Sequence, residues 1–527
     1  MRFLSVNLDS FLIELSDLTE TMALFRHLQH AKHVAIVDMI PAAKTILVQF
    51  NPLMIEQQQL THWIAQQKIR CDDIVAGREV IIDVQYDGED LISVAELLGM
   101  STREVIQRHT EAAWQVAFIG FAPGFGYLIR PDQPFGSVPR LASPRKKIPA
   151  GSVGLAGEYS GVYPKESPGG WQLIGRTYEQ MWDVHREFPA HLMPGNQIIF
   201  RDRTSQSVTV NIPKVFGKSS KNIQQGEAVL EILQSGMQTL LQDEGRVQQF
   251  SLGVGVGGAL DKRAMCLANR CVGNPDNATV LEILNGGFKA KILAPMVIAI
   301  TGAQGQVCVD YADGTSGFLP CSKAVALDQG DVVQITQPTH GLRHYVAIRG
   351  GIAAEPILGS TSFDTLAELG TTPLKAGDQV HVADLAVQAV ADIESIAQTL
   401  PQAGDVVELD FVLGPRTDWF KPESLDLLFE QTWLVTNEIN RIGLRLKGEY
   451  ALQRCVEKEL PSEGTCVGAL QVPPNGQPVL FMNDHPLTGG YPVIGAVAND
   501  HLDLVAQIPS GCLIKFKKVS IFMDELL

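Results

Sequence analysis

Two similar stretches, Gly169-Gly-Trp-Gln-Leu-Ile-Gly175 and Gly489-Gly-Tyr-Pro-Val-Ile-Gly495, decide the fold expected for this chain. Each is preceded by a P-x-G turn, which begins 20 residues earlier at Pro149 and 15 residues earlier at Pro474. Paired glycines let a backbone turn tightly and approach a ligand, and the aromatic residue that follows offers a face for stacking. The repeat favours two related β-barrels in one chain, although coincidence between glycine-rich turns would also produce it.

The sequence around the first stretch is typical of β-structure. From Val116 to Val210, short apolar runs alternate with Gly and Pro and show almost no helical period, which predicts a compact barrel with long loops. Ser101 and Glu104 form a capping box, so a short helix is expected to end near His109. From Val229 to the end, β-like segments dominate again.

The first 85 residues have a different pattern of expected secondary structure. Strand-like runs at Phe11–Leu15, Val34–Met39, Thr45–Phe50 and Val80–Val84 are interrupted by two segments of helical period, between Thr21 and Ala31 and after Pro52. The order β-α-β-β-α-β predicts a ferredoxin-like α+β unit. We therefore expect a mainly β protein with this α+β unit at 1–85, a barrel at 86–212, a polar linker at 213–226, and barrel lobes at 227–527.

Composition excludes several classes of protein. A chain of 527 residues is too long for one core, and 42 basic against 58 acidic side chains give a net charge of −16, which argues against a nucleic-acid or anionic-membrane binder. No apolar stretch approaches the ~20 residues of a spanning helix, and acids occupy the place of a signal-peptide core. Eight Cys without CxxC pairs are typical of reduced packing residues, so we expect a cytoplasmic protein.

Familiar catalytic motifs are missing from the sequence. It has no GxxxxGK[ST], HExxH or GxSxG pattern and no Cys/His ligand set, so no metal is expected. The run from Gly253 to Gly258 looks like a dinucleotide fingerprint but follows no βαβ unit. His340 and His344 are more typical of structural or solvated histidines than of metal ligands.

Two polar, glycine-rich segments carry the chemistry that we expect. In the first, Arg145 and Lys147 beside the backbone N–H groups of residues 150–152 would form an anion cradle, although a rigid loop with solvated basic side chains has the same sequence. In the second, Gln471–Tyr491, Asp484 could act as an acid or base and Thr488 as a hydroxyl donor. For Asp484 a turn-capping role is equally compatible with the sequence.

The same segments carry a family resemblance. FAPGFGY, SPRKKIPAGSVGLAG and VYPKESPGGWQLIGRT resemble the allophanate hydrolase subunit 1 (KipI-like) family. TLLQDEGR, ALDKRA, ANRCVGNP, LEILNGG, DWF, RIGLRL and QVPPNGQP with TGGYP resemble the subunit 2 (KipA-like) family. The chain therefore resembles a fusion of the B and C subunits of bacterial ATP-dependent 5-oxoprolinase, and the same modules are similar to the carboxyltransferase region of urea carboxylase.

The resemblance implies cyclophilin-like barrels and the opening of the 5-oxo-L-proline lactam to L-glutamate with ATP hydrolysis, ATP being supplied as MgATP. It also implies a partner, the LamB/YcsF-type A component of 5-oxoprolinase, and a small lactam as substrate, while a homo-oligomer stays open. Asp484, Lys147 and Arg145 are the expected catalytic groups. The expected substrate- or nucleotide-binding residues are His109, Phe121, Pro123, Gly124, Phe125, Tyr127, Gly151, Ser152, Gly169, Gly170, Trp171, Arg246, Asp261, Asn269, Arg441, Arg445, Gln471, Thr488, Gly489, Gly490 and Tyr491.

Departures from the family pattern leave other functions open. Gly126 replaces a usual proline, Gly255-Val-Gly257 replaces a usual S-P-S, and Thr361 replaces a usual arginine. A biotin-dependent carboxyltransferase is one alternative, but the chain has no Met-Lys-Met biotinylation motif, so biotin would come from another protein. A KipI-like regulator of a sensor histidine kinase is the other.

Overall fold

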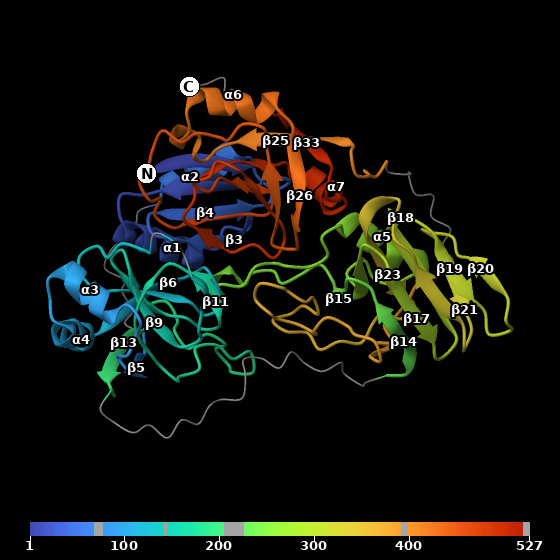
Figure 1. Ribbon diagram of the computed structural model, residues 1–527, viewed down its shortest axis with the longest axis horizontal. Helices are drawn as coiled ribbons and strands as arrows, with labels where there is room; N and C mark the ends of the chain where they lie inside the picture. The colour runs from blue at the N-terminus through green and yellow to red at the C-terminus, as the bar shows by residue number, and fades with distance from the viewer. Residues whose placement is uncertain (68–76, 142, 144, 205–225, 391–398, 520–527) are drawn as a thin grey trace.

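The structure is a computed structural model that describes residues 1–67, 77–141, 143, 145–204, 226–390 and 399–519. It contains four units, which we call the N-terminal unit, the first barrel, the two-sheet unit and the second barrel. In Figure 1 the two-sheet unit lies on the right, the second barrel at the top and the first barrel at the lower left. Within the described residues, no helix has the length and apolar character needed to cross a membrane.

The N-terminal unit is one antiparallel sheet with two helices. Its strands lie in the order β1-β2-β4-β3. Helix α1 begins after Asp17, whose carboxylate accepts a hydrogen bond from the Glu20 N–H at 2.9 Å, and its apolar side packs on the sheet. The elements are β1 (Arg2–Asn7), β2 (Ser10–Glu14), α1 (Leu18–Ala31), β3 (Ile36–Pro41), β4 (Thr45–Phe50) and α2 (Gln57–Ala65).

The first barrel contains seven strands in the order β12-β9-β10-β7-β6-β13-β5, and a bridge between Gln85 and Arg176 joins the two edges. A separate ribbon of β8 and β11 lies beside it. The elements are β5 (Glu79–Val84), α3 (Leu91–Leu98), α4 (Thr102–Thr110), β6 (Trp114–Ile119), β7 (Gly126–Ile129), β8 (Arg145–Ile148), β9 (Ser152–Ala156), β10 (Tyr159–Val162), β11 (Ser167–Gly169), β12 (Gln172–Arg176) and β13 (Gln197–Asp202).

One strand of the expected ferredoxin-like unit belongs elsewhere. The run Val80–Val84 lies in β5, which pairs in parallel with β13, and its side chains Val80, Ile82 and Val84 are buried in the barrel core. The fourth strand of the N-terminal sheet is β1 instead. The α+β unit is therefore present with the order β-β-α-β-β-α, and the barrel begins before residue 85 because the alternating apolar face of β5 is covered there.

The second barrel is closed and repeats the first, strand for strand. Its order is β25-β32-β29-β30-β27-β26-β33, and its first strand, β25, again pairs in parallel with its last, β33. Both barrels contain a small antiparallel ribbon, which is β28 with β31 here. The elements are β25 (Val406–Leu413), α6 (Pro422–Glu430), β26 (Trp433–Ile439), β27 (Gly443–Lys447), β28 (Glu463–Gly464), β29 (Ala469–Gln471), β30 (Val479–Phe481), β31 (Thr488–Gly489), β32 (Val493–Val497), α7 (Leu502–Ala506) and β33 (Leu513–Lys518).

The repeat extends to details of packing. Trp114 and Trp433 each begin the second strand of their barrel and are buried. Each indole N–H donates to a backbone carbonyl five residues earlier, that of His109 at 3.0 Å and that of Leu428 at 3.1 Å. The two Gly-Gly-aromatic stretches also occupy equivalent places, between the ribbon and the strands β12 and β32. The prediction of two related barrels is confirmed.

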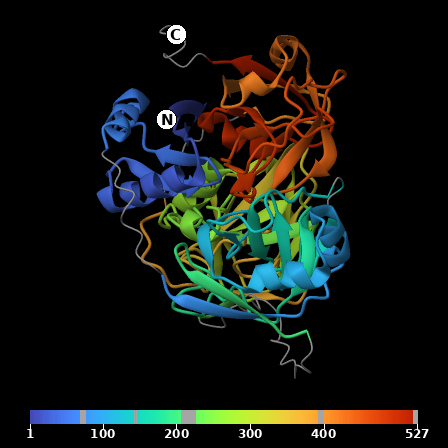
Figure 2. The ribbon, with the colours of Figure 1, turned by 90° about the vertical axis from the view of Figure 1, so that its left-hand side faces the viewer.

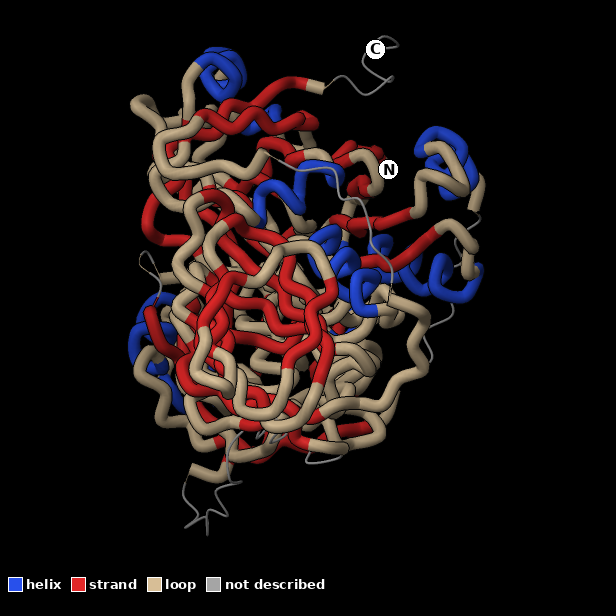
Figure 3. Tube along the Cα trace, turned by 90° about the vertical axis from the view of Figure 1, so that its right-hand side faces the viewer, coloured by secondary structure: helices blue, strands red, loops and turns tan. Residues whose placement is uncertain are grey.

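The two-sheet unit contains the rest of the second half. One sheet has the order β20-β19-β22-β17-β14-β24 and the other β15-β16-β23-β18-β21, and a single apolar core lies between them; Figure 3 views the molecule from this side. The elements are β14 (Ala228–Ser235), β15 (Gln238–Gln242), α5 (Lys262–Val272), β16 (Val280–Leu284), β17 (Phe288–Ile292), β18 (Met296–Gln304), β19 (Val307–Asp310), β20 (Ser316–Phe318), β21 (Ala324–Leu327), β22 (Val332–Ile335), β23 (His340–Ile348) and β24 (Gln379–His381). Barrel lobes were expected across 227–527, but within the described residues the closed barrel spans residues 406–518 and the part before it forms two open sheets. Residues 213–225 of the expected linker lie outside the described part.

The N-terminal unit contacts both barrels. One apolar core joins Phe11 of β2 to Phe125 and Tyr127 of the first barrel, and a second joins Leu12 and Leu47 to other segments. Strand β1 also packs against β25 and β32 of the second barrel. Figure 2 shows this unit beside the second barrel and above the first. The contacts bring residues far apart in the sequence to one junction.

Candidate functional site

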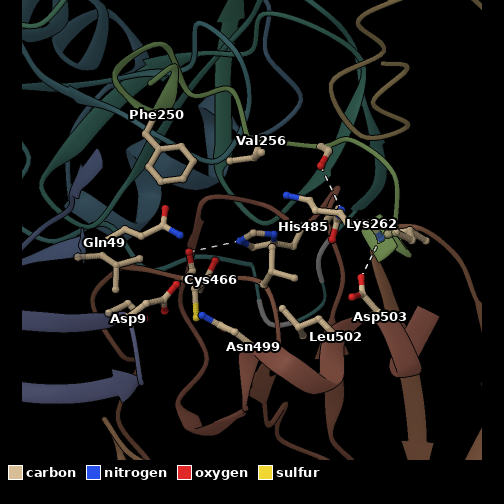
Figure 4. Close-up of a pocket in the computed structure, with 17 residues that line it drawn as sticks. Asp9, Gln49, Phe250, Val256, Lys262, Cys466, His485, Asn499, Leu502 and Asp503 are labelled. Carbon is tan, nitrogen blue, oxygen red and sulfur yellow. Dashed lines mark hydrogen bonds between the residues drawn. The ribbon is translucent and has the colours of Figure 1, made fainter. Parts of the chain in front are cut away.

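A pocket of about 310 Å³ opens where the N-terminal unit, the segment before α5 and the second barrel meet. We call it the junction pocket (Figure 4). A cavity of this size is at the lower end of the range for small-molecule sites. Its lining residues are Asp9, Ser10, Leu47, Gln49, Phe250, Val256, Gly257, Leu260, Lys262, Thr465, Cys466, Val467, Asn483, His485, Asn499, Leu502 and Asp503.

Asp9, Gln49 and Asn499 form a polar group in this pocket, with Cys466 beside them (Figure 4). Burial raises the pKa of Asp9, and hydrogen bonds from the Asn499 and Gln49 side chains partly offset that rise. Burial also raises the pKa of the Cys466 thiol to about 12, so the thiol is neutral at physiological pH.

Charged groups of α5 and α7 line another part of the pocket. Lys262 at the start of α5 donates its backbone N–H to the Asp503 carboxylate at 2.8 Å, and Arg263 pairs with the same carboxylate at 3.1 Å. In the view of Figure 4, Lys262 and Asp503 lie on the right and Asp9 and Gln49 on the left. The pocket is therefore lined by Lys262 and Asp503 on one side and by Asp9, Gln49 and Asn499 on the other.

His485 lies in the wall of the pocket and is almost fully buried. Its Nδ1 is 2.9 Å from the Met482 carbonyl oxygen and its Nε2 is 3.3 Å from the Thr465 carbonyl oxygen. Burial lowers the pKa of this imidazole. Both ring nitrogens therefore face backbone oxygens of the protein.

A buried cluster of charged side chains, which we call the ion-pair cluster, lies behind Gly257. Arg441, in the loop between β26 and β27, donates to both oxygens of Asp484, at 2.9 and 3.0 Å, and to Glu282 of β16 at 2.5 Å. Glu282 also accepts from the Tyr345 hydroxyl at 2.9 Å. The cluster thus fastens the second barrel to the two-sheet unit through fully buried charges.

Asp364 and Arg246 complete the ion-pair cluster. A Cβ placed on Gly257 would lie 3.8 Å from Arg246 Nη1, Asp364 Oδ2 and Asp484 Oδ1 alike. Burial, followed by the charge of Asp484, raises the pKa of Asp364 to about 7. Arg246 Nη1 is buried and makes no hydrogen bond to the described residues, which is costly for a guanidinium.

The structure brings three predicted residues, Arg246, Arg441 and Asp484, into this cluster. Asp261 caps α5 through the Ala264 N–H at 2.9 Å and accepts from Gln507 at 2.7 Å. The remaining predicted residues of the two-sheet unit and second barrel lie apart from it. Asn269 is buried and donates to two backbone carbonyls, and Arg445 is exposed and paired with Glu438. Gln471 ends β29, Thr488 and Gly489 form β31, and Gly490 and Tyr491 follow β31.

The aromatic residues of the first barrel that were expected to bind substrate or nucleotide are packed rather than open. Phe125, Tyr127 and Trp171 are each at most 5% exposed and belong to the core shared with the N-terminal unit, where Phe121 also packs. An aromatic cluster in a glycine loop has the same sequence signal whether it lines a pocket or fills a core. Pro123 and Gly124 are buried in the same loop.

His109 lies in the centre of the first barrel. Its ring nitrogens bond to the hydroxyls of Tyr86 at 2.7 Å and Ser160 at 2.8 Å, and its ring stacks on Phe200. Burial, then the charge of Arg130, lowers the pKa of this histidine to about 3, so it is neutral. The structure thus places it in the core of the first barrel.

The predicted anion cradle already contains carboxylates. Arg145 pairs with Asp90 at 2.7 Å and Glu89 at 3.4 Å, and the exposed Lys147 pairs with Glu166 at 2.9 Å. Gly151 has φ +80° and leaves no room for a Cβ beside the Thr177 carbonyl, and Ser152 begins β9. This geometry favours a structural role for the loop, and the anion role stays a prediction.

The two Gly-Gly turns approach each other through the side chain of Arg140. A Cβ on Gly490 would lie 3.1 Å from Arg140 Nη1, and one on Gly170 would lie 3.7 Å from Arg140 Cβ. On the same contact, the Phe121 N–H donates to the Thr488 hydroxyl at 2.9 Å, and Gly169 leaves space for the Tyr163 hydroxyl. The repeated loops therefore form part of the contact between the barrels.

None of the residues that line the junction pocket is among the site residues predicted from the sequence. His485 and Asn483 flank the predicted Asp484 and were within reach of that reasoning, because they lie in the same polar loop. Asp9, Gln49, Cys466 and Asn499 carry no signal in the sequence, since none of them stands in a recognisable motif. Only the three-dimensional contact between the two halves assembles them.

Comparison with known proteins identifies the family. The model described as "Carboxyltransferase domain, subdomain C and D" matches residues 1–192, and the model described as "Carboxyltransferase domain, subdomain A and B" matches residues 252–518. The crystal structure of TTHA0988 has a TM-score of 0.82 and 28% sequence identity, and the alignment covers 96% of this chain and 99% of that one. The mainly β fold with its α+β unit and barrels is therefore confirmed.

Curated relatives match each half separately. The second half is similar to the C component of 5-oxoprolinase from Escherichia coli (strain K12), with 34% identity over 296 residues, or 56% of this chain and 92% of that protein. A further segment is similar to the B component of 5-oxoprolinase from Escherichia coli O157:H7, with 46% identity over 128 residues, or 24% of this chain and 58% of that protein. The resemblance to a fused B and C pair is confirmed, and the chain belongs to the carboxyltransferase-domain family, with subdomains C and D before subdomains A and B.

Proposed function

We propose that this chain is the fused B and C component of an enzyme that opens 5-oxo-L-proline to L-glutamate with ATP. The observation that carries the proposal is the junction pocket, a small cavity lined by residues of both family halves, such as Asp9 and Asn499. The names of the relatives in both halves support it. The apolar side chains Leu47, Phe250 and Val256 suit the methylene groups of a five-membered ring, and Lys262 suits a carboxylate.

The chemistry needs more than this pocket. An amide carbonyl is a poor electrophile, and transfer of a phosphoryl group to its oxygen makes its carbon open to attack by water. Among the described lining residues Lys262 is the one lysine or arginine, and Asp9 and Asp503 add two carboxyls, so the lining is ill suited to a triphosphate. We therefore assign the lactam to the junction pocket and expect ATP to bind elsewhere in a complex with the LamB/YcsF-type A component.

A carboxyltransferase component is the second candidate, because the matching family models carry that name. It would act on a small amide presented with carboxybiotin from another protein. The two candidate functions differ in their requirement for biotin and in their reaction products, so an assay of the products distinguishes them.

The test is release of phosphate by the purified chain with ATP, Mg²⁺ and 5-oxo-L-proline, with and without a LamB/YcsF-type partner protein. We expect phosphate and glutamate to appear in a 1:1 ratio when chain, partner and substrate are all present. Glutamate formation that proceeds unchanged without this chain, or no turnover in any mixture, would contradict the proposal. Turnover that depends on a biotin carrier and bicarbonate would favour the second candidate.

The predicted anion cradle gives a separate prediction. Because the exposed Lys147 is paired with Glu166 on the surface, Lys147→Ala is expected to change turnover less than about twofold. Arg145→Ala tests the phosphate role directly, since this residue has a buried Nη1 that makes no hydrogen bond within the described residues. A rise in the KM for ATP of tenfold or more in Arg145→Ala, with normal thermal stability, would support the role of Arg145 in binding phosphate.

A further inference from the structure

Three charged side chains of the ion-pair cluster converge on one side of Gly257. Arg246 comes from the loop after β15, Asp364 from the loop before β24, and Asp484 from the loop after β30. A Cβ placed on Gly257 would have Arg246 Nη1, Asp364 Oδ2 and Asp484 Oδ1 as its nearest neighbours outside the adjoining residues, each at 3.8 Å. A small group on this side of Gly257 therefore meets three polar atoms.

The Arg246 guanidinium is fully buried and only partly satisfied. Its Nε donates to the Ile357 carbonyl at 3.0 Å and its Nη2 to the Ser362 carbonyl, whereas its Nη1 makes no hydrogen bond to the described residues. Arg246 has no exposed surface, so bulk water does not reach this nitrogen. Because a buried donor without an acceptor costs free energy, Nη1 indicates a bound partner.

Both carboxyls can accept a further hydrogen bond on the oxygen that lies toward Gly257. Asp364 uses its other oxygen, Oδ1, for two backbone N–H groups, at 2.8 and 2.7 Å. Asp484 takes three hydrogen bonds on Oδ2, while its Oδ1 accepts one from Arg441 at 3.0 Å. Since a carboxylate oxygen accepts about two hydrogen bonds, a partner that carries O–H groups can bind to both residues.

The partner that suits these three atoms is small, neutral, and both a donor and an acceptor. A cation would be repelled by the guanidinium and an anion by the carboxyls, while an apolar group would leave Nη1 unpaired. A water molecule can accept from one N–H and donate to two oxygens, and a buried water typically makes about three hydrogen bonds. The three polar atoms therefore match the hydrogen-bonding groups of water.

We propose that a water molecule is bound on this side of Gly257, where it accepts from Arg246 Nη1 and donates to Asp364 and Asp484, and that Gly257 lacks a side chain to make room for it. These three residues are not among the described lining residues of the junction pocket, so the water site is separate from the proposed lactam site. The water joins the two-sheet unit to the second barrel beside the Arg441 ion pairs. Gly257 itself lines the junction pocket, so the water lies directly behind the pocket wall.

A crystal structure of the full chain, from crystals soaked in sodium bromide, tests the site directly. We expect electron density for a water within hydrogen-bonding distance of Arg246 Nη1 and of at least one of the two carboxyls, with no anomalous signal from bromide. A bromide peak at this position would show an anion site instead. That result, the absence of any density there, or a direct bond from Nη1 to a protein group would overturn the proposal.

Gly257→Ser and Gly257→Ala form a matched pair, because both add a Cβ at a residue with φ +62° and they differ only in a hydroxyl. The hydroxyl of Gly257→Ser can take the place of the water, whereas the methyl group of Gly257→Ala displaces the water and leaves Arg246 Nη1 unpaired. We expect Gly257→Ala to melt at least about 2 °C below Gly257→Ser. Equal melting temperatures would contradict the role of Gly257 in making room for the water, and if neither variant folds, the crystal structure of the wild type decides.

Discussion

Arg441→Met is expected to destabilise the protein by about 3–5 kcal/mol, the cost of removing one partner of a buried ion pair. Arg441 is 2% exposed, and its guanidinium neutralises both Asp484 and Glu282. Methionine fills part of the space but leaves two carboxylates buried without their main counter-charge. Because these carboxylates lie on different units, we expect the contact between the second barrel and the two-sheet unit to weaken first.

Arg445→Met is the matched control, because Arg445 lies four residues further along the same hairpin but is exposed and paired with the exposed Glu438. We expect it to change stability by no more than about 0.5 kcal/mol. Chemical denaturation followed by tryptophan fluorescence measures both. Equal midpoints for the two variants would contradict the view that the ion-pair cluster fastens the units together.

Asp364→Asn is expected to make the protein more stable at pH 8 and to leave it nearly unchanged near pH 4. Burial and the charge of Asp484 raise the pKa of Asp364 to about 7, so the stability that this group contributes is present below its unfolded pKa and is lost as pH rises through 7. A rise of about three units corresponds to roughly 4 kcal/mol as an upper limit. Asparagine stays neutral, keeps an acceptor for the Ala367 N–H, and can donate to Asp484.

Asp243→Asn is the control, because it is expected to change the stability at neutral and higher pH in the opposite direction. Burial would raise the pKa of Asp243, but hydrogen bonds from Ser360 and Ser362 outweigh it and hold the pKa below its usual value. The stability from Asp243 is therefore present above its unfolded pKa and is lost as pH falls, so this variant should be destabilised most at neutral and higher pH. Melting temperatures measured from pH 4 to pH 8 test both, and an Asp364→Asn curve parallel to that of the wild type would contradict the assignment.

The barrels were predictable from the sequence because the residues that mark their corners are neighbours along the chain. The Gly-Gly-aromatic stretches mark equivalent corners, where Gly169 makes room for Tyr163 and Gly490 for Arg140. The pairing of Val80–Val84 was not predictable in the same way, since an alternating apolar strand suits either sheet and only the partner β13 decides. Loop aromatics such as Phe125 were expected to bind substrate or nucleotide, but burial in a shared core gives the same sequence pattern.

The candidate site was predictable only in part. Arg246, Arg441 and Asp484 lie in distinctive motifs, and the structure brings them together. The pocket itself joins Asp9 to Asn499, which are nearly the whole chain apart, and neither residue stands in a motif. The residues of a site that forms between units have no fixed spacing in the sequence, so composition and periodicity do not reveal the site.

The most direct test of the account is whether 5-oxo-L-proline binds in the junction pocket. Val467→Trp places a large side chain among the lining residues, and Val34→Trp, at a position 77% exposed on the N-terminal unit, is its control. Equilibrium dialysis with labelled 5-oxo-L-proline measures the affinity of the wild type and both variants. The account predicts binding to the wild type and to Val34→Trp and loss of at least tenfold in affinity in Val467→Trp, whereas equal affinity in all three proteins would contradict it.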